Sequence, residues 1–215
     1  MYHILVLDVP YVAQENAWSC GYVCFMMLRL LSYASVSAVM AEFELSWALG
    51  SDPVAAAQLS PLKDKEGKAL HTGADDYCGL LRHKRVPCDV FTFKDGLGLL
   101  AFCRDYFAKG GALGGEGAVL AATVGALFLQ RDGHCYVAIG VRYCPADNDV
   151  AIICFDSRTP ESPVTLIDKE RVGREVAGRE KTSWQVLVVY EGYELSEDEG
   201  RRLSRNVKLT CNKTG

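Results

Sequence analysis

The chain has 215 residues, of which 49% are hydrophobic and 23% charged, and its formal net charge is −4 at pH 7. A chain of this size and composition can bury a hydrophobic core without metal ions or disulfides, and it fits one sizeable domain. The negative balance gives no indication of a nucleic-acid partner or of an anionic membrane surface. No apolar stretch reaches the length of a membrane span. We therefore predict neither a nucleic-acid nor a membrane partner.

The nine cysteines are odd in number and scattered, and no two of them form a CxxC pair. This spacing argues against a structural zinc site, and we predict no metal and no cofactor. The first eight residues lack the basic segment and the long apolar segment of a signal peptide. Many unpaired cysteines without a signal peptide indicate a reducing compartment, so we predict a cytoplasmic protein.

The first half of the chain is predicted to be mainly helical. Apolar residues at helical spacing, or in long runs without Gly and Pro, predict helices at about residues 20–32, 35–47, 74–84 and 98–108. Short strands are expected at 4–9 and 86–93. The glycine-rich stretch Gly110–Gly117 lacks the Lys-Ser/Thr of a phosphate-binding loop and follows a helix instead of a strand, so we interpret it as a surface loop.

The second half is predicted to be mainly β. Apolar, β-branched and aromatic runs bounded by turn residues predict antiparallel strands at 118–128, 135–143, 150–155, 164–167 and 184–190, with a short helix at 168–177. N-terminal helices packed on a C-terminal antiparallel sheet form an α+β fold. We expect a single domain over residues 1–193, followed by a charged tail at 194–215.

Cys20 is the first candidate catalytic residue, because it opens the predicted helix at 20–32. The free N–H groups and the positive dipole end of a helix lie at its first turn, and both favour a thiolate, the reactive form of cysteine. Gln14, six residues earlier, can bring a side-chain amide to the same place and stabilise an oxyanion. Gly21 and Trp18 are assigned to substrate binding, Gly21 for close approach and Trp18 as a wall of the cleft. Core packing is an equal alternative for Trp18.

His134 and Asp156 are the candidate partners of that thiol. His134 opens the predicted strand at 135–143, and Asp156 closes the next strand at 150–155. Two antiparallel strands joined by a turn bring these positions together, so Asp156 can orient the imidazole as the third member of a triad. Gly133, directly before the histidine, is assigned to substrate binding. A structural histidine and a turn-capping aspartate are the alternatives.

The chain order Gln14, Cys20, His134, Asp156 is the order found in papain-like cysteine peptidases. The segments Gln14 to Cys24, with Trp18-Ser19-Cys20-Gly21, and Gly133 to Gly140 resemble the guanylyl cyclase domain containing family. That family resembles the papain-like superfamily near the bacteriocin-processing double-glycine peptidases. The resemblance implies a papain-like fold. Family members often carry Asp where this chain has Ser19, and an amide or a variable residue at the position of Asp156.

The leading prediction is a papain-like cysteine hydrolase, a thiol protease or isopeptidase, that acts on a peptide or protein substrate. Two alternatives stay open. One is a guanylyl cyclase or nucleotide-binding protein, as the family name implies. Such a cyclase needs paired carboxylates for two metal ions, and Asp75-Asp76 and Asp147/Asp149 lie in a helix start and a turn without an evident partner. The other is a papain-like scaffold that has lost catalysis and binds partners.

Overall fold

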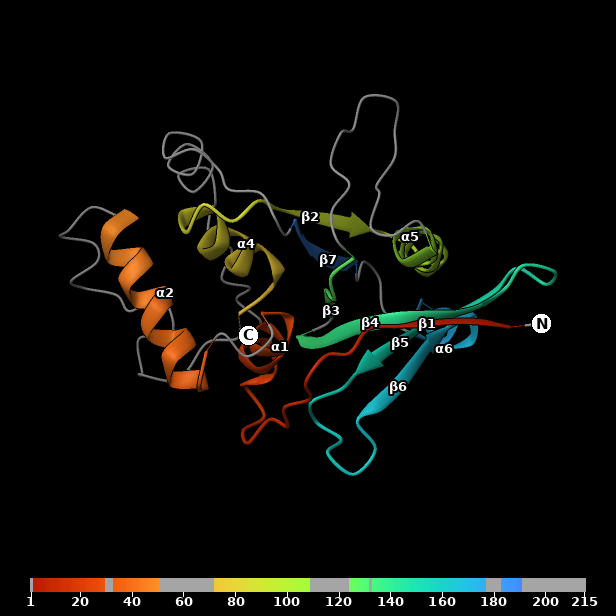
Figure 1. Cartoon of the computed structure of the whole chain (residues 1–215), viewed down its shortest axis with the longest axis horizontal. Coiled ribbons are helices and arrows are strands. Elements are labelled where there is room, and N and C mark those ends of the chain that lie inside the picture. Colours follow the sequence, from red (N-terminus) through yellow and green to blue (C-terminus); the bar gives the residue numbers. More distant parts are fainter. Residues whose placement is uncertain are drawn as a thin grey trace.

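The computed structural model describes residues 2–29, 33–50, 72–108, 124–131, 133–176 and 183–190. These residues form an α+β structure in which helices pack on a large antiparallel sheet (Figure 1). The glycine-rich loop at 110–117 and the charged tail at 194–215 lie outside the described residues. Within the described part of the chain, no helix combines the length and the apolar character that crossing a membrane requires.

The helices lie close to where the sequence predicts them. Their bounds are α1 Cys20–Leu28, α2 Val36–Gly50, α4 Ala74–His83, α5 Gly96–Ala108 and α6 Lys169–Val176. All nine residues of α1 are buried, as its unbroken apolar sequence predicts. Phe25 of α1 stacks on Tyr77 of α4, with ring centroids 4.4 Å apart. This packing fixes the position of the first turn of α1 relative to the sheet.

Seven strands of the described residues form the sheet. They are β1 His3–Val6, β2 Cys88–Phe93, β3 Leu127–Arg131, β4 His134–Cys144, β5 Asp149–Phe155, β6 Val164–Asp168 and β7 Trp184–Val189. Among the described residues, β3 begins only at Leu127 and continues to Arg131, later than the predicted strand at 118–128. The apolar run alone does not determine the register. Pairing with β4 extends β3 through Arg131, and pairing with β7 extends through Gln130.

The strand order is β2-β7-β3-β4-β5-β6, and β1 pairs with the part of β4 that lies beyond the first residue of β3. All of these pairings are antiparallel. Two strands from the first half of the chain therefore join the sheet, which the sequence placed mainly in the second half. Gly140 makes the pairing with β1 possible, because a Cβ there would lie 1.9 Å from the Leu5 carbonyl oxygen.

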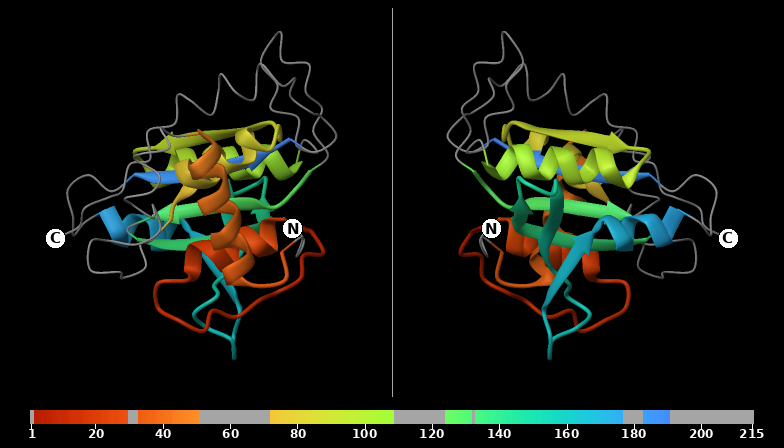
Figure 2. Two further views of the ribbon diagram at one scale, coloured as in Figure 1. Left: turned by 90° about the vertical axis from the view of Figure 1, so that its left-hand side faces the viewer. Right: turned by 90° about the vertical axis from the view of Figure 1, so that its right-hand side faces the viewer.

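The sheet has a buried core on each face, and successive residues of a strand point into opposite cores. In β4, Cys135 and Val137 pack with α1, α2 and α4, whereas Tyr136 and Ala138 pack with α5. Figure 2 shows the same division, with α2 nearest the viewer in one view and α5 and α6 in front in the opposite view. This alternation places the side chain of Cys135 on the face that carries α1.

Candidate active site

Cys20 is the first residue of α1, and its sulfur faces the start of β4. The Sγ atom lies 3.9 Å from the carbonyl oxygen of Gly133. The side chain of Ser19 donates to the Asn16 carbonyl and does not cap the helix. The first N–H groups of α1 have no acceptor within the helix. The residue is only 2% exposed, but its sulfur lies among polar groups at the edge of the core.

His134 and Asp156 are neighbours across the β4–β5 hairpin. The pairing of Val137 with Phe155 brings the start of β4 beside the end of β5. The His134 Nε2 atom lies 3.0 Å from Asp156 Oδ1, and both side chains are largely buried. Because Nε2 is used for this hydrogen bond, the other ring nitrogen of His134 is left for the thiol of Cys20.

Arg158 holds the carboxylate of Asp156 from the other side. Its backbone N–H donates to Oδ1 over 3.0 Å, and its guanidinium reaches Oδ2 over 3.1 Å. Burial opposes ionisation of Asp156, but the hydrogen bonds from His134 and Arg158 outweigh it and hold the pKa of this carboxyl below its usual range. Asp156 therefore stays a carboxylate and keeps accepting the hydrogen bond from the Nε2–H group of the imidazole.

The electrostatics favour a thiolate at Cys20 and a protonated ring at His134. The hydrogen bond with Cys135 is the largest cause that lowers the pKa of Cys20, and burial acts in the opposite direction. The hydrogen bond and the charge of His134 lower this pKa further, to about 4. Burial opposes the charged form of His134, but hydrogen bonds to Asp156 and Cys20 raise its pKa. The two groups stabilise each other as an ion pair at neutral pH.

Gln14 is tied to the residue that follows Asp156. Ser157, which is fully buried, donates from Oγ to Gln14 Oε1 over 2.8 Å. The backbone N–H of Gln14 donates to the Ser157 carbonyl over 3.0 Å. Gln14 Nε2 donates to the Asn16 carbonyl over 3.1 Å, which leaves one hydrogen of the amide for a further acceptor.

The three residues assigned to substrate binding have different surroundings. Trp18 is half-buried and meets Tyr22 edge to face, with centroids 5.8 Å apart, so part of its ring belongs to the core. Gly21 faces the protein itself, because a Cβ there would lie 2.6 Å from the Thr72 carbonyl oxygen. Gly133 is exposed in the left-handed region at φ 75°, and a Cβ there would have no atom within 4 Å.

Three further residues assist the candidate site residues and are not predicted from the sequence: Cys135, Ser157 and Arg158. Each of them directly follows a candidate residue or lies within two positions of one. Their proximity along the chain was visible, but the bonds they make depend on the face of β4 and on the turn after β5. Among the described residues, no group of three or more His, Cys, Asp or Glu side chains could hold a metal ion.

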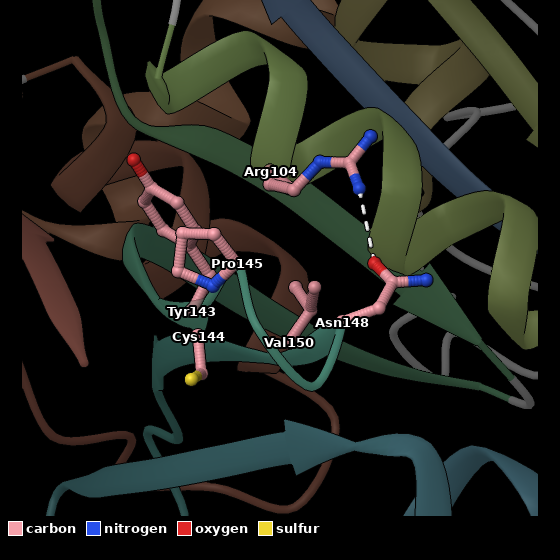
Figure 3. A pocket seen from close by; sticks show the side chains of 6 residues that line it. All are labelled: Arg104, Tyr143, Cys144, Pro145, Asn148 and Val150. Carbon is pink, nitrogen blue, oxygen red and sulfur yellow. Dashed lines mark hydrogen bonds between the residues drawn. The ribbon is translucent and has the colours of Figure 1, made fainter. Parts of the chain in front are cut away.

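A pocket of about 260 Å³ lies at Cys144, the last residue of β4, whereas His134 is the first residue of that strand. Figure 3 shows the side chains that line the pocket. It is lined at the β4–β5 hairpin by Tyr143 and Asn148, among others. Arg104 of α5 donates to Asn148 Oδ1 over 3.3 Å at this pocket. Because β4 runs between the two places, the pocket is separate from the group of Cys20 and His134.

Together, the sheet, the helix that carries Cys20 and the hairpin that carries His134 define an α+β fold of the papain-like kind. The structure is similar to the crystal structure of UfSP from C. elegans, with a TM-score of 0.56 and 8% sequence identity. The match covers 89% of this chain and 35% of that chain, so this chain spans about a third of the length of UfSP in that structure. At this identity, the likeness concerns the fold.

A scan against protein-family models and a search of curated proteins find no match. The resemblance to the guanylyl cyclase domain containing family therefore gains no support from these comparisons.

Proposed function

We propose that this protein is a papain-like cysteine hydrolase in which Cys20 is the nucleophile and His134 the general acid and base. The observation that carries the proposal is the 3.0 Å hydrogen bond between His134 Nε2 and Asp156 Oδ1. His134 directly follows Gly133, whose carbonyl oxygen lies 3.9 Å from Cys20 Sγ. His134 also lowers the pKa of Cys20. The thiolate forms a bond to a substrate carbonyl carbon, and His134 then gives its proton to the departing amine. Water attacks the resulting thioester, His134 takes a proton from that water, and the thiolate is released.

The negative oxygen of the tetrahedral intermediate needs donors near the start of α1. The backbone N–H of Cys20 and the remaining hydrogen of the Gln14 amide are the proposed donors. The hydrogen bond from Gln14 Nε2 to the Asn16 carbonyl supports this role, because a carbonyl only accepts and so fixes which end of the amide carries the N–H groups. Gly133, exposed beside the sulfur, is the proposed point at which substrate backbone approaches.

The proposed substrate is a peptide or protein with a scissile amide or isopeptide bond. A papain-like scaffold that only binds partners is the alternative that shares this fold. No observation favours a nucleotide cyclase, since the acidic pairs have hydrogen-bond partners within the protein. Asp76 accepts from the backbone N–H of Gly73, and Asp149 accepts from Tyr2.

The test combines labelling and turnover. Wild-type protein is treated with iodoacetamide at pH 6, where ordinary thiols react slowly, and the labelled cysteines are located by mass spectrometry. We expect preferential labelling of Cys20 that is lost in His134→Ala and kept in the matched variant His83→Ala. His83 lies at the end of α4, away from the site.

A peptide library is then digested with wild-type protein and with Cys20→Ala. Cleavage by the wild-type protein but not by Cys20→Ala supports the hydrolase. Equal, slow labelling of all nine cysteines contradicts it. Selective labelling of Cys20 without any cleavage supports the non-catalytic scaffold.

A further inference from the structure

Two cysteines outside the candidate active site lie in direct contact. Cys78 of α4 and Cys88, the first residue of β2, have their sulfur atoms 3.4 Å apart. Each is 4% exposed. The Cys88 thiol also lies 3.5 Å from the carbonyl oxygen of Cys78. The two thiols therefore face each other in a small, mostly dry space between a helix and the edge strand of the sheet.

The chain around this pair holds both partners in place. The Val86 N–H donates to the Leu81 carbonyl over 2.9 Å and closes the connection between α4 and β2. The guanidinium of Arg82 donates twice to the Cys88 carbonyl, over 3.2 and 3.0 Å, and pairs with Asp89 over 2.9 Å. The backbone on both sides of Cys88 is thus tied to the helix that carries Cys78.

The two thiols are not equivalent. The hydrogen bond from Cys88 is the largest cause that lowers the pKa of Cys78, burial opposes it, and the charge of Arg82 adds to it. The same contact, together with burial, raises the pKa of Cys88. Cys78 is therefore the thiol that ionises first, and Cys88 keeps its proton.

We propose that Cys78 and Cys88 are a redox modification site that a hydroperoxide converts into a reversible disulfide between α4 and β2. A disulfide has an S–S length of about 2.05 Å, so the two sulfur atoms must approach by little more than 1 Å, roughly the change that side-chain rotation provides. The inference is independent of the proposed hydrolase activity, because it concerns other residues and another readout.

The chemistry balances with hydrogen peroxide as the oxidant. The Cys78 thiolate attacks one peroxide oxygen, the O–O bond breaks, and the other oxygen leaves as hydroxide, which takes up a proton to become water. The resulting sulfenic acid is attacked by the sulfur of Cys88, which loses its proton as the S–S bond forms. The sulfenic oxygen leaves as a second water. Two thiols are oxidised to one disulfide, and one peroxide is reduced to two waters.

The disulfide would close a loop of about ten residues and restrict the unfolded chain. For a chain of this length, we expect the oxidised form to melt about 5–10 °C higher than the reduced form. Treatment with dithiothreitol should reverse the shift.

Peptide mapping tests the linkage directly. Trypsin can cut after Arg82, Lys84 and Arg85, so Cys78 and Cys88 fall on separate peptides, residues 69–82 and 86–94. Neither peptide contains another cysteine. The folded full chain is treated with hydrogen peroxide, remaining thiols are alkylated, and the digest is analysed without reduction. We expect the two peptides joined by a disulfide, and separate after reduction.

The variant Cys20→Ser provides a background in which the candidate nucleophile does not consume peroxide. In that background, Cys88→Ala should abolish the joined peptide, whereas the matched variant Cys144→Ala should keep it. The wild-type digest alone decides the question if a variant fails to fold. Free, alkylated Cys78 and Cys88 after oxidation, or either of them joined mainly to another cysteine, would overturn the proposal.

Discussion

Ser157 Oγ lies 2.8 Å from Gln14 Oε1, and this hydrogen bond joins two loops that are 143 residues apart in the chain. One loop follows β5 and carries Asp156, and the other precedes α1 and carries the proposed oxyanion donor. The backbones of the same two residues are also hydrogen-bonded. The group that orients His134 and the group proposed to stabilise the oxyanion are therefore parts of one connected unit.

Replacing Ser157 by Ala removes the hydroxyl group that donates to Gln14 Oε1 and holds the amide in place. We expect kcat/KM for peptide cleavage to fall about 3- to 10-fold, the effect of losing one neutral hydrogen bond. Gln14→Ala should lose at least as much activity. In the double variant, the second change should add little, because both act through the same amide. If the losses of the two single variants add in the double variant, Ser157 and Gln14 do not act through the same amide.

The alkylation rate of Cys20 should follow an unusually low pKa. In the wild-type protein we expect the rate to stay high from pH 9 down to about pH 5 and to halve near pH 4, because the pKa of Cys20 is about 4. His134→Ala removes a hydrogen bond and a positive charge from the thiolate. The midpoint should then move upward by about one pH unit or more. An unchanged midpoint would show that His134 does not act on this thiol.

Asp156→Ala leaves Nε2 of His134 without its acceptor. The pKa of His134 should fall, because the bond to Asp156 is a main cause that raises it. Titration of the ring by NMR checks this direction. The rate of Cys20 alkylation at pH 6 should drop about 10- to 100-fold, the effect of losing a charge-assisted hydrogen bond. Asp156→Asn retains a side-chain oxygen and should recover part of the loss.

Gly21→Ala tests whether this glycine serves packing. The added methyl group would meet the Thr72 carbonyl oxygen, which belongs to the backbone and cannot rotate away. We expect the free energy of unfolding to fall by about 1–3 kcal/mol, as for overpacked sites, measured by urea denaturation. Gly98→Ala is a milder control, because its Cβ would meet only the side chain of Asp95 at 3.2 Å. Equal stability of Gly21→Ala and the wild-type protein would refute the packing role.

Asp76 should make the stability of the fold depend on pH. Burial is the largest cause that raises its pKa from 3.8 to about 6, against the hydrogen bond from Gly73. The folded state therefore binds more protons than the unfolded state between about pH 4 and 6, and stability falls as pH rises through this window. Asp76→Asn should remove this decline, which amounts to about 2–3 kcal/mol. Denaturation at pH 4 and pH 7 measures the difference.

Local sequence patterns were sufficient to predict most of the helices and strands. The unbroken apolar run after Cys20 predicted a buried helix, and alternating or β-branched runs predicted strands near the observed bounds. These signals depend on neighbouring residues alone, so the sequence shows them directly. Register was harder, because the end of β3 depends on pairing with strands that lie elsewhere in the chain.

The sequence by itself determined which reactive groups are present: a thiol at a helix start, an imidazole at a strand start and a carboxylate at the end of the following strand. Only the tertiary structure decided which groups assist them. The contact of Ser157 with Gln14 and of Cys135 with Cys20, and the filling of the space beside Gly21 by Thr72, all join segments far apart in sequence. Such contacts follow from how helices and strands pack in three dimensions, and no local pattern encodes them.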